Sequence, residues 1–191
     1  MQNYDIFLEP AGPGYYSHVR VYNNVCVNTL GTGSQAMAIS FYSACPTDDL
    51  VVANNLTDGG FGGGAYTVRQ VGTLNSGYVT NSYFVNNISV QGSLNNIIDN
   101  AITQASNANV TPAQTASNFA TYAAGSASND YHLKPATPLA GVGFNCSAFF
   151  TLDRDGNARS TSGAWDLGPY VYAGSASTLP AAPRGLRVVS P

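Results

Sequence analysis

The sequence predicts an all-β protein: a right-handed parallel β-helix, a single-stranded solenoid of about four coils with three strands in each coil and a C-terminal capping segment. Two observations lead to this prediction. Only 9% of the 191 residues are charged, whereas there are 20 glycines and 12 tyrosines, a profile typical of an extracellular β-rich protein. In addition, a short asparagine-containing pattern recurs along the first half of the chain. This length suits one main domain.

The repeated pattern is an asparagine followed by an aliphatic residue and then a small one, as in "NNVC", "NNLT" and "NNIS". The aligned asparagines are 31, 32 and 22 residues apart, at Asn24, Asn55, Asn87 and Asn109. Asparagine tolerates the left-handed backbone region, and its amide can bond to the backbone or to an equivalent asparagine one coil away. We therefore expect these four residues to form an asparagine ladder at a bend between two strands.

The repeat also predicts which way side chains face, because side chains alternate along a strand. Aliphatic residues after the asparagine are expected inside the coil: Val25, Leu56, Ile88 and Val110. The small residues that follow are expected outside: Cys26, Thr57, Ser89 and Thr111. Before the asparagine, the alternation puts Val21, Val52 and Phe84 inside and Arg20, Val51 and Tyr83 outside.

A further strand precedes this bend in each coil, at residues 4–10, 36–44 and 65–72, and the glycine-rich stretch 58–66 is expected to be a loop between coils. Residues 93–107 also fit a helical face through Leu94, Ile97, Ile98, Ala101 and Ile102. A fourth coil is favoured there because the Asn109 register follows directly.

Charge and hydropathy exclude some classes of partner. The formal charge is −3 with one lysine, so the clustered cations that nucleic-acid binding needs are absent. No apolar run approaches the roughly 20 residues that span a bilayer. The N-terminus lacks the basic and apolar regions of a signal peptide. We therefore expect either that an export signal has been removed or that these residues are the tail of a longer chain. A coil that begins at residue 4 leaves a bare solenoid end, which predicts a homo-oligomer or such a continuation.

The positions of the cysteines and histidines in the sequence do not match the spacing of any metal-binding motif. Cys26, Cys45 and Cys146 are an odd number, which leaves one thiol unpaired or in an intermolecular bond, and Cys26 with Cys45 is one pairing that the sequence allows. No cofactor is predicted.

The C-terminal half contains "NDYHLKPATPLAGVG" (129–143) and "LDRDGNARSTSGAWDLGPYVY" (152–172). In this order the motifs resemble the closing segment of bacterial pectate-lyase-like β-helix proteins of the choice-of-anchor Q type. The resemblance covers residues 18–172. It implies a β-helix with a cap at 129–172, in a family whose members include polysaccharide lyases, hydrolases and adhesins. Residues 173–191 read as a linker and a segment similar to the first strand of a fibronectin type III domain.

These features predict a secreted or cell-surface β-helix with a structural, adhesive or polysaccharide-binding role. The alternative is the C-terminal part of a polysaccharide lyase or glycoside hydrolase acting on uronate-containing polysaccharide. The groove over the first strand of each coil offers Glu9, Tyr42 and Arg69 as substrate-binding candidates, together with Ser40 and Thr67.

The two enzymatic mechanisms would need different groups. In a lyase, Arg69 or Tyr42 would abstract the proton α to a uronate carboxylate, and a hydrolase would need two positioned carboxylates. The sequence offers Glu9 and the pair Asp48 and Asp49, without a second carboxylate in a matching column. This scarcity favours a non-catalytic face, and no catalytic residue is assigned.

"DRDGN" (153–157) offers oxygens from Asp153, Asp155 and Asn157 to calcium, but it lacks the glycine spacing and glutamate of an EF-hand. A plain Asp-Gly turn, with Asp153 or Asp166 pairing with Arg159, is the favoured interpretation. We expect His132 to pack and hydrogen-bond in the cap.

Overall fold

The computed structural model describes residues 4–8, 16–27, 37–43, 47–59, 66–70, 79–91 and 102–175. Within these residues the chain is built mostly from short strands in parallel sheets, with a single α-helix. This confirms the all-β class.

Four parallel sheets make up the described strand stack, and each takes one strand from each of the first three passes of the chain. Two of the sheets, C and D, also take one from a fourth pass. Sheet A contains β1 (Tyr4–Leu8), β5 (Met37–Ser43) and β9 (Tyr66–Gln70). Sheet B contains β2 (Tyr16–Ser17), β6 (Thr47–Asp48) and β10 (Val79–Thr80). Sheet C contains β3 (Arg20–Tyr22), β7 (Val51–Ala53), β11 (Tyr83–Val85) and β13 (Thr103–Ala105). Sheet D contains β4 (Val25–Val27), β8 (Leu56–Asp58), β12 (Ile88–Val90) and β14 (Ala108–Val110).

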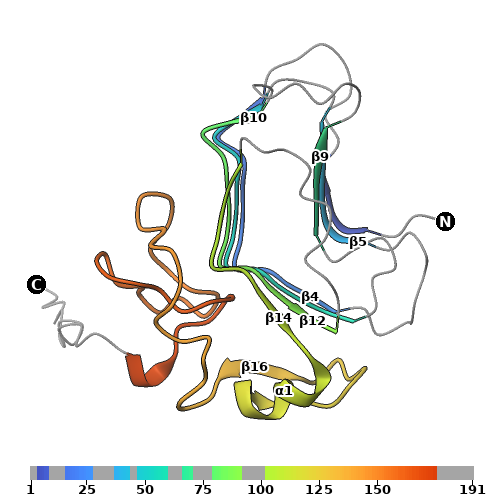
Figure 1. Cartoon of the computed structure of the whole chain (residues 1–191), viewed down its shortest axis with the longest axis vertical. Coiled ribbons are helices and arrows are strands. Elements are labelled where there is room, and N and C mark those ends of the chain that lie inside the picture. Colours follow the sequence, from blue (N-terminus) through green and yellow to red (C-terminus); the bar gives the residue numbers. More distant parts are fainter. Residues whose placement is uncertain are drawn as a thin grey trace, which may run out of the picture.

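The chain visits sheets A, B, C and D in the same order on each pass, and equivalent strands lie one behind another in Figure 1. The first three passes are β1–β4, β5–β8 and β9–β12, and β13 and β14 belong to a fourth. The described strands of this fourth pass lie at residues 103–110, in the stretch where a fourth coil was favoured from the sequence. Each complete pass has four strands, not three, because a left-handed residue separates sheet B from sheet C: His18, Asp49 and Asn81 have φ of 58°, 58° and 49°.

The asparagine ladder is present, with one correction. Nδ2 of Asn24 donates to Oδ1 of Asn55 at 2.9 Å, and Nδ2 of Asn55 donates to Oδ1 of Asn87 at 3.0 Å. The fourth rung is Asn107, because Nδ2 of Asn87 donates to its Oδ1 at 3.1 Å. Asn109, predicted to be that rung, instead lies opposite Ser89 in sheet D. The last turn is shorter than the sequence alignment assumed, so the register moves by two residues.

The expected facing of the aliphatic column was wrong. A left-handed residue precedes each ladder asparagine, namely Asn23, Asn54, Asn86 and Ser106, with φ between 53° and 59°. One such residue interrupts the two-residue alternation of side chains, so the inside and outside positions change places beyond the bend. The register also makes Ala108, not Val110, the fourth member of the column.

The aliphatic column therefore faces the C-terminal segment on the outer side of the bend between sheets C and D. The small column, expected outside, lies on the opposite strand face in the first three passes and is buried there: Cys26 is 5% exposed, and Thr57 and Ser89 are 0% exposed. Thr111, the fourth residue expected in this column, is exposed and occupies the N-cap position of the following helix. The alternation before the bend holds, with Val21, Val52 and Phe84 on the inner face.

The C-terminal segment begins with α1 (Pro112–Asn118), β15 (Phe119–Thr121) and β16 (Asp130–Leu133), and it ends at the short 3-10 helix Ala173–Ser175. In Figure 1 it lies beside the bend formed by sheets C and D. The segment therefore covers the side of the stack. The expectation from the sequence was a C-terminal cap at residues 129–172. The physical reason is the apolar outer face that the inverted alternation creates.

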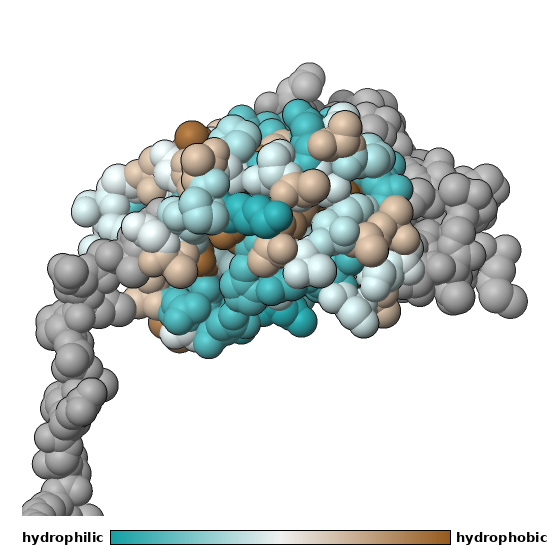
Figure 2. Space-filling view, turned by 90° about the horizontal axis from the view of Figure 1, so that it is seen from below, coloured by the Kyte–Doolittle hydropathy of each residue, from teal (hydrophilic) through white to brown (hydrophobic). Residues whose placement is uncertain are grey.

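Two hydrophobic clusters join this segment to the stack. In the first, Leu56, Ile88 and Val90 pack with residues of the C-terminal segment: Phe119, Tyr131, Leu133, Leu139 and Leu167. In the second, Val51, Ala53 and Val85 pack with Cys146, Phe150 and Trp165. On the described surface in Figure 2, apolar residues are scattered among polar ones.

The helix α1 was not expected, although its start has a sequence signal. Thr111 precedes Pro112 at the first helical position, and Oε1 of Gln114 accepts hydrogen bonds from the backbone N–H and the hydroxyl of Thr111.

None of the described residues belongs to a helix long and apolar enough to cross a membrane. Of the predicted linker and fibronectin-like segment at 173–191, residues 176–191 lie outside the described ranges, as do residues 93–101 of the ambiguous stretch.

Candidate functional site

A column of polar side chains at the left-handed positions attaches the C-terminal segment to every pass. Nδ2 of Asn23 donates to the carbonyl of Leu152 at 2.8 Å, and Nδ2 of Asn54 donates to the carbonyls of Asp166 and Gly168 at 2.9 Å each. Asn86 both donates to the carbonyl of Phe144 (2.8 Å) and accepts from its N–H (2.7 Å). The hydroxyl of Ser106 donates to the carbonyl of Val142 at 3.2 Å. The two asparagines of the "NN" pair thus have different partners, which the sequence analysis missed.

A buried carboxylate makes a second polar attachment. Asp58 is 2% exposed and accepts hydrogen bonds from the hydroxyls of Tyr131 (2.6 Å) and Tyr122 (3.1 Å). Nδ2 of Asn129 and Nε2 of Gln91 complete the set of donors, at 3.3 Å and 3.1 Å. Burial, followed by the nearby Asp58 charge, raises the pKa of Tyr122 to about 12. Burial and the bond to Asp58 likewise raise the pKa of Tyr131.

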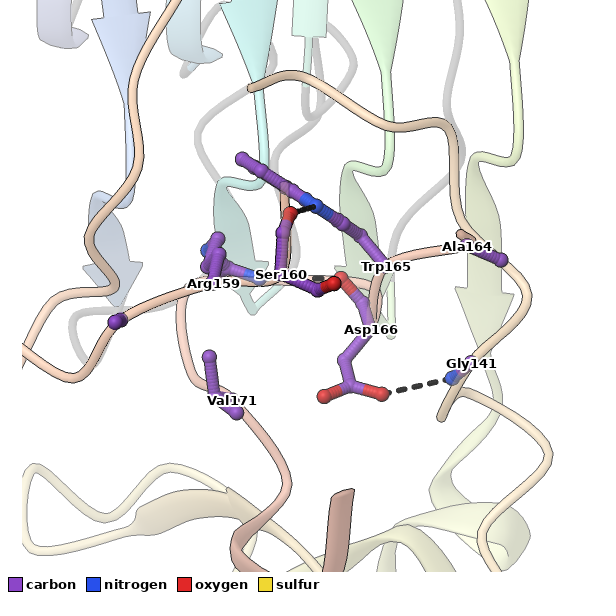
Figure 3. Close-up of a pocket in the computed structure, with 8 residues that line it drawn as sticks. Gly141, Arg159, Ser160, Ala164, Trp165, Asp166 and Val171 are labelled. Atoms are coloured by element: carbon purple, nitrogen blue, oxygen red, sulfur yellow. Dashed lines mark hydrogen bonds between the residues drawn. The ribbon is translucent and has the colours of Figure 1, made fainter. Parts of the chain in front are cut away.

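A cleft in the C-terminal segment has the chemistry closest to a binding site (Figure 3). Its volume is about 70 Å³, which suits a small polar group or a few waters and not a sugar ring. The residues that line it are Gly141, Ala158, Arg159, Ser160, Ala164, Trp165, Asp166 and Val171.

Arg159 is the charged residue buried deepest beside this cleft, with 4% exposure. Its guanidinium donates to the carbonyls of Gly168 (2.9 Å) and Asp166 (3.4 Å) and to Oδ1 of Asn23 (3.3 Å), and it lies over the ring of Trp165. Nε has no hydrogen-bond partner among the described residues. Burial lowers the pKa of Arg159 to about 10, although Asp153 and Asp166 act in the opposite direction.

The carboxylates near Arg159 bond to backbone amides. Asp166 accepts from the N–H groups of Gly141 (2.7 Å) and Tyr172 (2.8 Å). The expected pairing of Arg159 with Asp166 is therefore a bond to the backbone carbonyl of Asp166, not a direct carboxylate ion pair. These groups hold loops together, and the cleft presents no described nucleophile with an adjacent base.

The "DRDGN" stretch forms the turn that the sequence analysis favoured. Oδ1 of Asp153 accepts from the N–H groups of Asp155 and Asn157, and Oδ2 accepts from Nδ2 of Asn157 and the N–H of Val171. These bonds lower the pKa of Asp153 against the opposing effect of burial. No cluster of three or more His, Cys, Asp or Glu side chains suited to a metal occurs within the described ranges.

His132 lies between two carboxylates on the surface. Its Nδ1 is 2.5 Å from Oδ1 of Asp130, its Nε2 is 2.7 Å from Oδ2 of Asp155, and its ring packs on Tyr170 at a centroid distance of 4.1 Å. Desolvation disfavours the imidazolium, but the bonds to Asp130 and Asp155 outweigh it and raise the pKa of His132. This matches the expected packing and hydrogen-bonding role.

Two of the groove candidates lie in sheet A. Tyr42 of β5 is the register partner of Arg69 of β9, and Ser40 is the partner of Thr67. Since residues two apart in a strand share a face, these four positions form a two-by-two patch. Glu9 lies outside the described ranges.

The carboxylate pair considered for hydrolysis is engaged within the stack. Asp49 bonds to the side chains of Arg20 and His18, and the bond to Arg20 contributes most to lowering the pKa of Asp49. Oδ1 of Asp48 accepts from the hydroxyl of Thr80 (2.6 Å) and from Nδ2 of Asn81 (2.7 Å).

Cys146 is a buried free thiol, whereas Cys45 lies outside the described ranges, so the structure does not address its pairing with Cys26. No family model, curated protein or solved structure matches the chain.

Proposed function

We propose that the chain forms part of a right-handed parallel β-helix in a secreted protein, with a structural or adhesive role at the cell surface or in the extracellular matrix. In this proposal the solenoid binds polysaccharide along sheet A, through the patch that contains Tyr42 and Arg69.

The structural role is supported by the hydrogen-bond partners of the buried polar side chains. The ladder asparagines bond to one another, the left-handed asparagines bond to the C-terminal segment, and three of the four donors to Asp58 come from that segment. These groups fix a rigid stack with a covered side. A rigid parallel stack presents its outward side chains at the strand spacing of about 4.8 Å, a regular surface for a polymer.

The polysaccharide proposal is supported by the register of sheet A. Tyr42 and Arg69 lie directly opposite each other on neighbouring strands, so an aromatic residue and a cation occupy adjacent positions. An aromatic ring can pack against a sugar ring, and a guanidinium can bind a uronate carboxylate.

Binding to soluble uronate-containing and neutral polysaccharides, measured by isothermal titration calorimetry, tests this proposal. We expect binding to the uronate polymer by the unmodified chain and at least a tenfold weaker affinity for the Tyr42→Ala/Arg69→Ala variant. Arg154→Ala removes one arginine from the C-terminal segment and is the matched control, which should bind as the unmodified chain does. Absence of binding by the unmodified chain, or equal loss in the control, would refute a site at sheet A.

The same register favours one second candidate, a uronate lyase. A base and a carboxylate-neutralising cation are both required for proton abstraction α to a carboxylate, and the register partners Tyr42 and Arg69 are residue types that could supply them. The assay is the ultraviolet absorbance of the unsaturated product in the calorimetry samples. Product formation that disappears in the Arg69→Ala variant would establish the lyase, and binding without product would leave the adhesive role.

A further inference from the structure

The asparagine ladder has a direction. In each step the earlier asparagine donates from both its backbone N–H and its Nδ2 to Oδ1 of the next one, as in the bonds from Asn55 to Asn87 at 3.1 Å and 3.0 Å. The later asparagine also donates from Nδ2 to a carbonyl of the earlier pass. Asn55 donates to Val21, Asn87 to Val52 and Asn107 to Phe84.

The two ends of the ladder are therefore complementary. At the β3–β4 edge, Oδ1 of Asn24 receives no hydrogen bond from the described residues, and its Nδ2 turns to the carbonyl of Tyr22. At the β13–β14 edge, the backbone N–H of Asn107 and one hydrogen of its Nδ2 have no described acceptor. One end is an acceptor and the other end is a pair of donors.

The backbone of β13 also has a residue whose polar groups face away from the described passes. The N–H of Thr103 bonds to Ser82 of the third pass at 2.9 Å. Because alternate residues of a parallel strand direct their backbone groups to opposite sides, the N–H and carbonyl of Gln104 point away from the stack. Its carbonyl is the equivalent of the Val21, Val52 and Phe84 carbonyls that accept from the ladder.

Within residues 102–110, the sequence has none of the residues that usually prevent strand association. Residues 102–110 contain no charged residue and no proline, and the side chains of Thr103, Gln104 and Asn109 are exposed. Exposed strand edges normally carry a lysine, a proline or a bulge that blocks pairing with another chain.

We propose that copies of this chain stack head to tail, with the β13–β14 edge of one copy against the β3–β4 edge of the next, so that one asparagine ladder runs through the joint. Asn107 donates twice to Oδ1 of Asn24 in the next copy, and that Asn24 exchanges the carbonyl of Tyr22 for that of Gln104. This inference rests on the proposed structural role of the solenoid and names its partner, a second copy.

The direction of the asparagine ladder determines the symmetry of the assembly. A two-fold dimer would bring two acceptor ends or two donor ends of the ladder together, so the ladder could not continue across a two-fold joint. A head-to-tail contact repeats without closing and gives a filament. Four passes at about 4.8 Å each give an expected rise of about 19 Å per copy.

The test is the solution mass of the full chain over a concentration series, measured by light scattering after size exclusion, with electron microscopy of the same samples. We expect the mass to increase with concentration. In the micrographs we expect stacks in which each copy adds the rise given above. Gln104→Lys places a charge at the open edge and should keep the chain monomeric. Gln104→Pro, which removes the outward N–H without adding a charge, should do the same. Ala127→Lys adds the same charge in the exposed turn before β16 and should assemble as the unmodified chain does.

Circular dichroism melting checks that each variant is folded. A chain that stays monomeric, two-fold particles in the micrographs, or Gln104→Lys stacks as long as those of the unmodified chain would each overturn the proposal. None of these measurements uses polysaccharide, and calorimetry on the monomeric Gln104→Lys variant tests polysaccharide binding separately.

Discussion

The hydroxyl of Tyr131 lies 2.6 Å from Oδ2 of Asp58, and this bond joins the C-terminal segment to the second pass of the strand stack. Both residues are buried, at 4% and 2% exposure, so the carboxylate depends on its protein donors. The bond therefore ties two parts of the chain that are 73 residues apart.

Tyr131→Phe keeps the ring in its hydrophobic cluster and removes only the hydroxyl. A buried carboxylate that loses its shortest donor should lower the free energy of unfolding by about 1–3 kcal/mol. The control is Tyr122→Phe, because that hydroxyl is 3.1 Å from Asp58 on a side chain that is only partly buried, and its loss should cost less. Equal losses in urea denaturation would show that Tyr131 is not the dominant donor.

Interior rungs of the asparagine ladder should matter more than its ends. Asn55→Ala removes a fully buried amide and takes away its hydrogen bonds to the N–H of Asn24 and to the carbonyl of Val21, while Oδ1 of Asn87 keeps only the backbone N–H of residue 55. We expect a loss of about 2–3 kcal/mol in the free energy of unfolding. Asn24→Ala, at the partly exposed end, should cost clearly less in the same chemical denaturation series, and the opposite order would contradict the ladder's role.

Gly168 allows the C-terminal segment to approach the stack closely. Its φ is +76°, and a Cβ built there would lie 2.7 Å from Cδ1 of Ile88. Gly168→Ala should destabilise the protein by more than about 1 kcal/mol, from backbone strain and from the contact. Gly156→Ala is the control, since φ is +84° and nothing lies within 4 Å of the added Cβ. The difference between the two melting temperatures isolates the contact with Ile88, and a difference of zero would exclude it.

His132 should make stability depend on pH. Its pKa is raised in the folded state, so the stability it contributes is complete below the unfolded value of about 6.5 and is lost as the pH rises through the folded pKa. Solvent exposure limits the effect to roughly 1 kcal/mol or less. We expect the melting temperature to fall between about pH 6 and about pH 8 in the unmodified chain and to fall less in His132→Asn. Parallel curves for the two proteins would assign the pH dependence elsewhere.

Cys146 should be inert in the folded protein. The side chain is fully buried, and burial raises the pKa of its thiol to about 12, so almost none of the reactive thiolate forms at neutral pH. Mass spectrometry after iodoacetamide treatment should find Cys146 unmodified in the native chain and alkylated in urea. Rapid native alkylation would show that the C-terminal segment opens readily.

The sequence repeat was sufficient to predict the strands of sheets A, C and D, the parallel stacking and three rungs of the ladder, because Asn24, Asn55 and Asn87 recur at nearly constant spacing. It did not predict the two-residue strands of sheet B. It did not predict the fourth rung, since both Asn107 and Asn109 fit the pattern and only the pairing of Ile88 with Ala108 selects the first. The facing of Leu56 and Ile88 also required the structure, because it depends on whether the residue before each rung is left-handed.

The C-terminal segment was harder to predict from sequence. Its motifs led to the expectation of a cap at 129–172, and they did not indicate which face of the stack the segment covers. The signal that could have shown this is the doubling of the asparagine in "NN", because a ladder requires only one of the two. The small cleft beside Arg159 arises from loops 141–171 meeting in space, a contact that no periodic pattern encodes.

Attachment of the C-terminal segment at Asn23, Asn54, Asn86 and Ser106 has a consequence for how such a protein can change over evolution. Solenoids commonly gain or lose whole repeats, because each repeat contacts only its neighbours. Here one non-repetitive segment contacts every pass at a different backbone carbonyl, so inserting or deleting a coil within residues 20–110 would misalign all the attachments beyond it. Loop lengths between strands remain free to vary, whereas the number of coils under the segment is fixed by the segment itself.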